Sequence, residues 1–400
     1  MRLKLIGFIG LIGLLCPTGS LSAQDSTRLD LRIDGNLFFI NNEYTGSQLD
    51  GYTLPGFMLR PHIGWRLDRR VSLHAGASWL HYWGNTGFPQ GALSEVMPSA
   101  SDNRHALHLV PWLQAQIDFT PRLRLVLGSL DVNHYHNLPL PLYNPERTFA
   151  TDPEAGAQLL LDSRHLALDA WVDWREFIWY NSSRQERFNC GLSLTPRYAT
   201  DLFRLALPLH AVVQHRGGEG LTDSTMGHHS YYNFAAGIDA TCTPGDFDLG
   251  VTAYFLAYSR SGAPESEFVY NNWGCLIAPP PAFKHGYGFW TSLTAAWHST
   301  RLNVDYWTGD KFVPLLGSYL FSNLSSNIAD MTHRRLQLIM LRAQHTWSFA
   351  GCDLQLDAAY IHTFAHAADR LFYWPCSLSA NNMYSFGIQL ILHPTIALVK

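Results

Sequence analysis

The chain has 400 residues, of which 47% are hydrophobic and only 15% are charged, well below the roughly 25% charged residues of a typical soluble domain. Its formal net charge is −4 at pH 7 with histidine neutral, and no basic patch stands out, which excludes nucleic acid as a partner. Beyond the N-terminus no apolar run approaches the roughly 20 residues of a membrane helix, so a membrane protein with this sequence has to be a β-barrel.

The first 23 residues have the pattern of a secretory signal peptide. Arg2 and Lys4 precede an unbroken apolar or glycine stretch from Leu5 to Leu15, and a cleavage site follows Ala23. We therefore expect residues 1–23 to be removed and residues 24–400 to form a single outer-membrane β-barrel domain.

Segments of alternating polarity fill the rest of the chain. In the first half we predict strands over Arg28–Phe39, Phe57–Leu67, Val71–Trp83, Leu107–Phe119, Arg122–Leu130, Ala155–Asp162 and His165–Arg175. In the second half we predict them over Phe188–Pro196, Phe203–His215, Tyr231–Cys242, Phe247–Tyr258, Tyr287–His298, Arg301–Trp307, Arg334–Trp347, Asp353–Phe364 and Met383–His393.

The stretch Asp162–Arg175 shows the alternation most clearly. One face is apolar and ends in Trp174, and the other carries Asp169, Asp173 and Arg175. A soluble sandwich would turn the apolar face to a core, whereas a membrane barrel turns it to lipid and the charged face to a wet lumen.

The connections decide between these two folds. About seven short turns alternate with about eight long loops, as in a barrel of about 16 strands with short periplasmic turns and long extracellular loops. Aromatic residues form two predicted belts near the strand ends. Members of the outer belt include Phe38, Phe39, Trp79, Tyr82, Trp83, Trp174, Tyr231, Tyr232, Tyr258 and Trp307. The C-terminus HPTIALVK lacks the usual final aromatic residue, so the last strand either extends through Ile396 and Leu398 or carries a non-standard assembly signal.

In signal, strand rhythm, belts and polar inner face, the chain resembles Gram-negative outer-membrane porins. The run WVDWREFIWYNSSRQERFNCGLS (Trp171–Ser193) also resembles a segment of poorly characterised outer-membrane proteins of Bacteroidota. The porin resemblance implies that the third loop, Asp131–Glu154, folds into the lumen and narrows it. This loop lacks the glycine-rich acidic tip of porins.

Charged residues on the inner face are the predicted pore lining, where they would filter solutes by charge and size or simply keep the lumen wet. They are Asp30, Arg32, Arg60, Asp118, Arg124, Asp169, Asp173, Arg204, Asp305 and Asp357. His62 and His108 lie on the same predicted face. In the third loop, Glu146, Arg147, Asp152 and Glu154 are the hypothetical constriction.

Catalysis and metal binding find less support in the sequence. Ser182 and Ser183 follow Asn181 as in a barrel hydrolase, but no histidine lies at a matching spacing on the same face, so we expect no enzyme. The pairs His134/His136 and His228/His229 lie in loops, where we expect solvated rather than metal-bound rings and no cofactor. The five mature cysteines are scattered, and a Cys352–Cys376 bridge stays open.

The main hypothesis is an outer-membrane, porin-like channel for passive diffusion of small hydrophilic solutes. A non-conducting barrel that partners envelope assembly or secretion proteins is the first alternative, and an outer-membrane lipid hydrolase is the second. The expected partners are outer-membrane lipid, the barrel-assembly machinery and, as one open arrangement, two further copies in a homotrimer.

Overall fold

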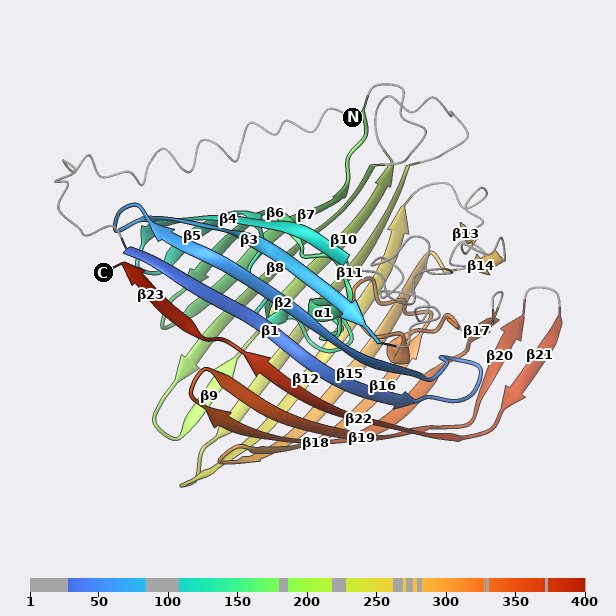
Figure 1. The fold of residues 1–400 in the computed structure, drawn as a ribbon. Helices are drawn as coiled ribbons and strands as arrows, with labels where there is room; N and C mark the ends of the chain where they lie inside the picture. The colour runs from blue at the N-terminus through green and yellow to red at the C-terminus, as the bar shows by residue number, and fades with distance from the viewer. Residues whose placement is uncertain are drawn as a thin grey trace.

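The structure is a computed structural model that describes residues 28–83, 108–179, 186–217, 228–261, 269–270, 276–278, 283–326, 328, 331–370 and 373–399. Its strands form one ring, seen obliquely in Figure 1, with the C-terminus at one end and the longer connections at the other. The predicted signal peptide lies outside the described residues.

The wall is built from antiparallel strands that follow each other around the ring. They are β1 (Arg28–Glu43), β2 (Tyr52–Arg66), β3 (Val71–Tyr82), β4 (His108–Thr120), β5 (Leu123–Ser129), β6 (Ala155–Asp162), β7 (Leu166–Glu176), β8 (Glu186–Ala199), β9 (Phe203–Ala206), β10 (Leu209–Gly217), β11 (His229–Cys242), β12 (Phe247–Ser261), β15 (His285–Trp297), β16 (Thr300–Asp310), β18 (Leu336–Phe349), β19 (Cys352–Thr363), β22 (Asn381–Leu392) and β23 (Thr395–Val399).

The ring closes where the first strand meets the last. β1 pairs with β2 on one side and with β22 and β23 on the other, with Leu37 opposite Leu390 and Leu31 opposite Ile396. Ile396 and Leu398 lie within β23, so the last strand extends through them, as one of the two sequence alternatives predicted.

Two prolines explain why 18 strand segments make 16 wall strands. Pro208 separates β9 from β10, and Pro394 separates β22 from β23, because proline has no N–H to donate to the ladder. Their carbonyls still accept, from Gly237 N at 2.9 Å and Ile33 N at 3.2 Å, so each pair of segments continues as one strand. The predicted closed, antiparallel, 16-stranded barrel is confirmed.

The outer face is a continuous apolar surface. Leu109, Leu113, Phe255 and Leu293 are each more than half exposed, although all are large and hydrophobic. A surface of this kind is stable only against lipid, so the barrel lies in the outer membrane.

The predicted outer aromatic belt is only half right. Phe39, Trp79, Trp83 and Trp174 point outward and are 38–50% exposed. Tyr232 also lies on the outward register, beside Phe234, whereas Phe38, Tyr82, Tyr231, Tyr258 and Trp307 point into the barrel and are buried. Strand phase decides this, because Phe38 shares the inward face of Asp30 and Asn36.

Two long loops fold back into the extracellular half of the lumen. The third loop carries η3 (Tyr135–Asn137) and α1 (Arg147–Ala150), which Figure 1 shows inside the ring. The loop after β16 carries η4 (Tyr319–Phe321) and β17 (Met331–His333). The two loops touch through a parallel bridge between Tyr143 and Leu316.

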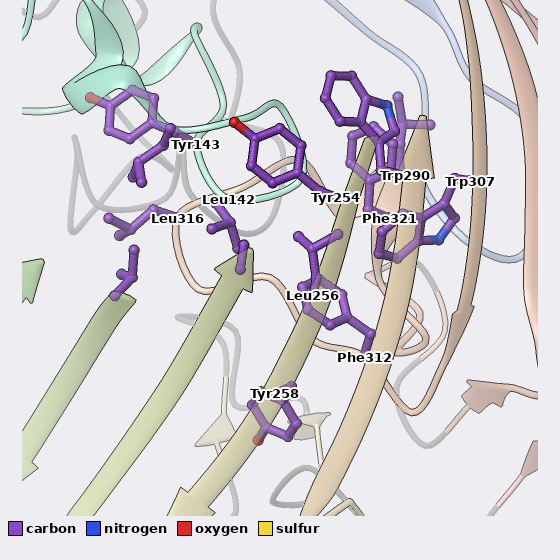
Figure 2. Close-up of a cluster of buried hydrophobic side chains, with 14 of the residues drawn as sticks. Leu142, Tyr143, Tyr254, Leu256, Tyr258, Trp290, Trp307, Phe312, Leu316 and Phe321 are labelled. Atoms are coloured by element: carbon purple, nitrogen blue, oxygen red, sulfur yellow. The ribbon is translucent and has the colours of Figure 1, made fainter. Parts of the chain in front are cut away.

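The inward aromatic residues form an apolar core around these loops. Figure 2 shows Tyr254, Leu256 and Tyr258 on β12 facing Leu142 and other loop side chains. Trp307 packs edge-on against Phe312 and Phe321, with ring centroids 5.2 and 5.3 Å apart. The third loop thus folds into the lumen, as the porin resemblance implied, and the inner face is partly apolar as well as charged.

Small extracellular sheets complete the described structure. β13 (Val269–Tyr270) pairs with β14 (Leu276–Ala278), and β20 (His366–Arg370) pairs with β17 and with β21 (Tyr373–Leu378). Cys352 and Cys376 are both free thiols, so no bridge joins them. Among the described residues no helix is long and apolar enough to span a bilayer.

Candidate functional site

The barrel wall is uneven between β4 and β7. β5 and β6 have 7 and 8 residues, whereas β4 has 13 and β7 has 11. The last β4–β5 pair joins Gln114 to Gly128, so His108–Leu113 continue toward the extracellular side without a β5 partner. At about 4.8 Å per strand, the missing ends of two strands leave a notch in the wall at that side.

A glycine is the last residue of each of these strands to pair with its outer neighbour, Gly128 with β4 and Gly156 with β7. Gly128 and Gly156 are paired, with φ of 89° and 155°. A Cβ on Gly128 would lie 2.3 Å from Leu113 O, and one on Gly156 would lie 2.1 Å from Val172 O. Only glycine fits this backbone, which bends both strands out of the ladder.

A cavity of about 270 Å³ lies at this notch. Its lining includes the outward-facing Pro111 and Trp174 and the inward-facing Asn189 and Gln214. Residues of both faces therefore line this one cavity, which lies within the thickness of the wall at the notch. We call it the wall pocket.

Three side chains from different parts of the chain meet beside the wall pocket. His108 Nε2 is hydrogen-bonded to Asp152 Oδ1, and Arg175 Nη1 donates to the carbonyl O of Asp152 at 3.2 Å. Asp152 is part of the third loop, whose end crosses the notch. The imidazole is about one-quarter exposed and Asp152 about 43% exposed, so water reaches the pair.

A carboxylate that accepts from one imidazole nitrogen fixes the tautomer and makes the other nitrogen a proton acceptor. The His108–Asp152 pair has the arrangement that a general base requires, and Arg175, from β7, adds a cation next to Asp152. Arg187 and Arg216 line the inner end of the wall pocket with Asn189 and Gln214.

A buried histidine anchors the third loop. His136 is hydrogen-bonded through Nδ1 to Asp169 and through Nε2 to Glu154, both at 2.9 Å, and its ring stacks on Trp171 with centroids 3.9 Å apart. Tyr143 OH donates to Glu154 at 3.0 Å.

The ionisation of this anchor follows from its partners. Burial by itself lowers the pKa of His136, but the hydrogen bonds with Asp169 and Glu154 and their charges raise it to about 9. Burial likewise acts to raise the pKa of Glu154, and the bond and charge of His136 bring it down to about 2. His136 is thus cationic, and residues 135–137 hold positive φ to place it.

The other hypothetical constriction residues are also tied into the wall. Glu146 accepts from Asn42 Nδ2 at 3.1 Å and from Tyr52 OH at 2.7 Å, and burial raises its pKa. Arg147 is buried with its guanidinium 5.9 Å from the Tyr143 ring centre. Of these four residues, Glu146 lines a cavity of about 900 Å³ in the lumen, and Asp152 lines the wall pocket. Their role as a constriction stays a prediction.

The predicted pore-lining residues all lie on the inward register of their strands. Several form pairs: Arg32 with Asp30, Arg124 with Asp118, Arg204 with Asp248, and Arg342 with Asp305. Arg60 and Asp357 line a cavity of about 900 Å³, and Arg60 also lines a smaller polar cavity of about 330 Å³. Asp169 and Asp173 instead face the third loop. Selective conduction by these residues stays a prediction.

The described residues hold no group of three or more His, Cys, Asp or Glu side chains placed to bind a metal ion. His134 is exposed, whereas His136 is buried in the anchor of the third loop. These two histidines therefore do not form a shared metal site. Ser182, Ser183 and the preceding Asn181 lie outside the described residues.

Comparison with known families bears on the whole barrel. The model of the lipid A 3′-O-deacylase-type family matches residues 21–400. This chain belongs to that family. The expectation that it is not an enzyme is therefore wrong, because the match is to an enzyme family. A search of curated protein sequences finds no match.

Solved barrels give looser likenesses. OpdK of Pseudomonas aeruginosa is 11% identical over 92% of this chain and 99% of its own, with a TM-score of 0.44. OmpT of Vibrio cholerae is 11% identical over 94% and 100%, with a TM-score of 0.46. OccK8 of P. aeruginosa is 13% identical over 94% and 99%, with a TM-score of 0.47. These superpositions are loose, and the fold assignment rests on the strand pairing of this chain.

The sequence predicted His108 on the inner face and Asp152 in the third loop, but it did not predict that the two side chains are in contact. His108 was placed on the lumen face and Asp152 in a constriction, 44 residues apart in sequence. The signal in the sequence that could have pointed to this region is the pair of glycines near the ends of the two short strands, Gly128 and Gly156.

Proposed function

We propose that this family member hydrolyses an ester-linked acyl chain of a lipid A-type glycolipid in the outer leaflet. The observation that carries the proposal is the His108–Asp152 pair beside a pocket that residues of both faces of the wall line. A glycolipid in the outer leaflet meets this pocket sideways, from the membrane, without leaving the bilayer.

The chemistry needs only a water molecule and the ester. Neutral His108, held by Asp152, takes a proton from water as the oxygen adds to the ester carbonyl. The negative charge that develops on the carbonyl oxygen is next to the cation of Arg175. The tetrahedral intermediate then releases the sugar oxygen, which takes the proton from His108. The products are a fatty acid and a free sugar hydroxyl.

The test is mass spectrometry of lipid A after incubation with the refolded mature protein in mixed micelles. We expect the loss of one acyl chain, and a fall of at least 100-fold in the His108→Gln variant, in the range of removed general bases. His81→Gln, on the lipid face at the same barrel end, is the matched control and should keep its activity. Intact lipid A after incubation with native protein, or an active His108→Gln variant, would contradict the proposal.

We also propose, as a second function, passive diffusion of small hydrophilic solutes. The cavity of about 900 Å³ in the lumen, whose lining includes charged and amide side chains, supports it. Planar-bilayer recordings test this: stable open steps support conduction. A folded barrel that never conducts would exclude it.

A further inference from the structure

The inner end of the wall pocket gathers three arginines. Arg175 comes from β7, Arg187 from β8 and Arg216 from β10, which are neighbouring strands of the wall. Arg187 and Arg216 are direct cross-strand partners, and Glu176, next to Arg175, is the other partner of Arg187. The three cations therefore form a row at one height, on the inner face.

Such a row is unfavourable by itself. Directly opposed side chains in a sheet have Cβ atoms roughly 5 Å apart, and like charges at this position repel. Arg175 is compensated by Asp173, with Nε and Oδ2 2.5 Å apart, and Arg187 by Glu176, with Nε and Oε2 2.9 Å apart. Arg216 Nε, in contrast, is buried and has no hydrogen-bond partner in the described part of the chain.

The neighbouring amides do not neutralise this charge. Asn189 Nδ2 donates to Asp173 at 3.2 Å, and Gln214 Nε2 donates to Asn189 Oδ1 at 3.4 Å. These bonds fix the carboxylate that orients Arg175, but they leave the donors of Arg216 facing the pocket. The row is thus pre-arranged for an anion.

We propose that this arginine row binds a phosphate group on the sugar headgroup of the glycolipid. The inference rests on the proposed function for the identity of the lipid, though not on its hydrolysis. A phosphate carries up to two negative charges and several acceptor oxygens, which match the planar forks of several arginines, whereas a carboxylate needs only one.

The shape of the wall pocket selects an amphiphile. Its outer end is apolar, with Pro111 and Trp174, and its inner end is cationic. A ligand that fills both ends has an acyl chain in the membrane and a phosphate toward the lumen. Asp152 lies between the ends and holds His108 on one side and Arg175 on the other. Phosphate binding would therefore position the acyl ester beside His108.

The experiment measures binding in the His108→Gln background, so that failure of hydrolysis and failure of headgroup recognition are separate results. Lipid A carrying its phosphates and chemically dephosphorylated lipid A are titrated into detergent-solubilised protein, with tryptophan fluorescence as the readout. We expect the phosphorylated lipid to bind at least tenfold more tightly. Arg216→Gln should remove this preference, and Arg216→Lys should restore part of it.

The matched control is Arg204→Gln, which removes an inward arginine paired with Asp248 at the other barrel end. It should keep the full preference. Barrel integrity of each variant is checked by heat-dependent gel migration. Equal affinity for the two lipids, or a preference that survives in Arg216→Gln, would overturn the proposal. A stabilisation by inorganic phosphate that needs Arg216, without any lipid preference, would identify free phosphate as the ligand and also overturn it.

Discussion

The two sides of this barrel wall are built differently. On the side of β12, β15, β16 and β18, strands of 11 to 15 residues pair along their length. Their inner face carries Tyr254, Trp290, Trp307 and Leu338, all buried against the loops in the lumen. On the side of β4 to β7, two strands stop early and the inner face carries charged and amide groups. The complete side of the wall packs against the loops, and the interrupted side places charged and polar side chains near the membrane.

The third loop connects the two sides, since it packs on the apolar wall through Leu142 and ends across the notch at Asp152. Replacing His136, which anchors this loop, is therefore the strongest test of the connection between the two sides. Removing one member of a buried ionic group leaves the others unpaired and costs roughly 3–5 kcal/mol.

We expect His136→Ala to lower the free energy of unfolding by about that amount and to lower hydrolysis with it. Urea-induced unfolding in detergent measures the first effect. His134→Ala, two residues away and exposed, is the control and should change the unfolding midpoint little. If both variants unfold at the same urea concentration, the loop is not held by this anchor.

Filling the wall pocket tests the interrupted side directly. Ala155 lines the pocket, so Ala155→Trp should obstruct it and reduce hydrolysis roughly 10- to 100-fold, about 1.4–2.8 kcal/mol in barrier. Ala253→Trp places the same ring on the lipid face of the complete wall and should leave the rate unchanged. A fully active Ala155→Trp variant would mean that the substrate takes another route.

Replacing a glycine near the end of β5 should have a smaller effect on stability. Gly128→Ala forces a Cβ to 2.3 Å from a backbone oxygen at positive φ, which costs about 1–3 kcal/mol. In Gly250→Ala, on β12, the new Cβ makes only ordinary contacts, because the nearest atoms are 3.5 Å away. We expect a lower urea midpoint for the first variant only. Equal midpoints would show that the notch does not depend on this backbone.

The smallest expected effect is on pH dependence. The pKa of His136 is raised from 6.5 to about 9, so its contribution to stability is complete below pH 6.5 and is lost as the pH rises through 9. The pKa of Glu154 is lowered from 4.5 to about 2, so its contribution is complete above pH 4.5 and is lost as the pH falls through 2. The anchor is therefore strongest between about pH 4.5 and 6.5.

Urea midpoints at pH 6 and pH 10 measure this effect. The native protein should be less stable at pH 10, and His136→Gln should show a smaller difference between the two values. A difference that is as large in His136→Gln as in the native protein would assign the pH dependence to other groups.

Much of the fold could be predicted from period-two patterns, because lipid outside and polar or packed groups inside constrain alternate residues. Asp169, Asp173 and Arg175 face inward as their spacing predicted. The same alternation does not tell whether an inward residue meets water or a loop, so Tyr258 and Trp307 were assigned to a belt. The site depended on Asp152 reaching His108, a tertiary contact without a local signal. The resemblance of Trp171–Ser193 to Bacteroidota proteins stays a prediction.

The most direct test of the account is a structure of the His108→Gln variant with a phosphorylated, acylated lipid A bound in a lipid nanodisc. We expect an acyl chain that passes between β4 and β7 to the membrane, with its ester beside residue 108 and a phosphate at Arg216. A glycolipid bound elsewhere on the barrel, with the wall pocket empty, would contradict it.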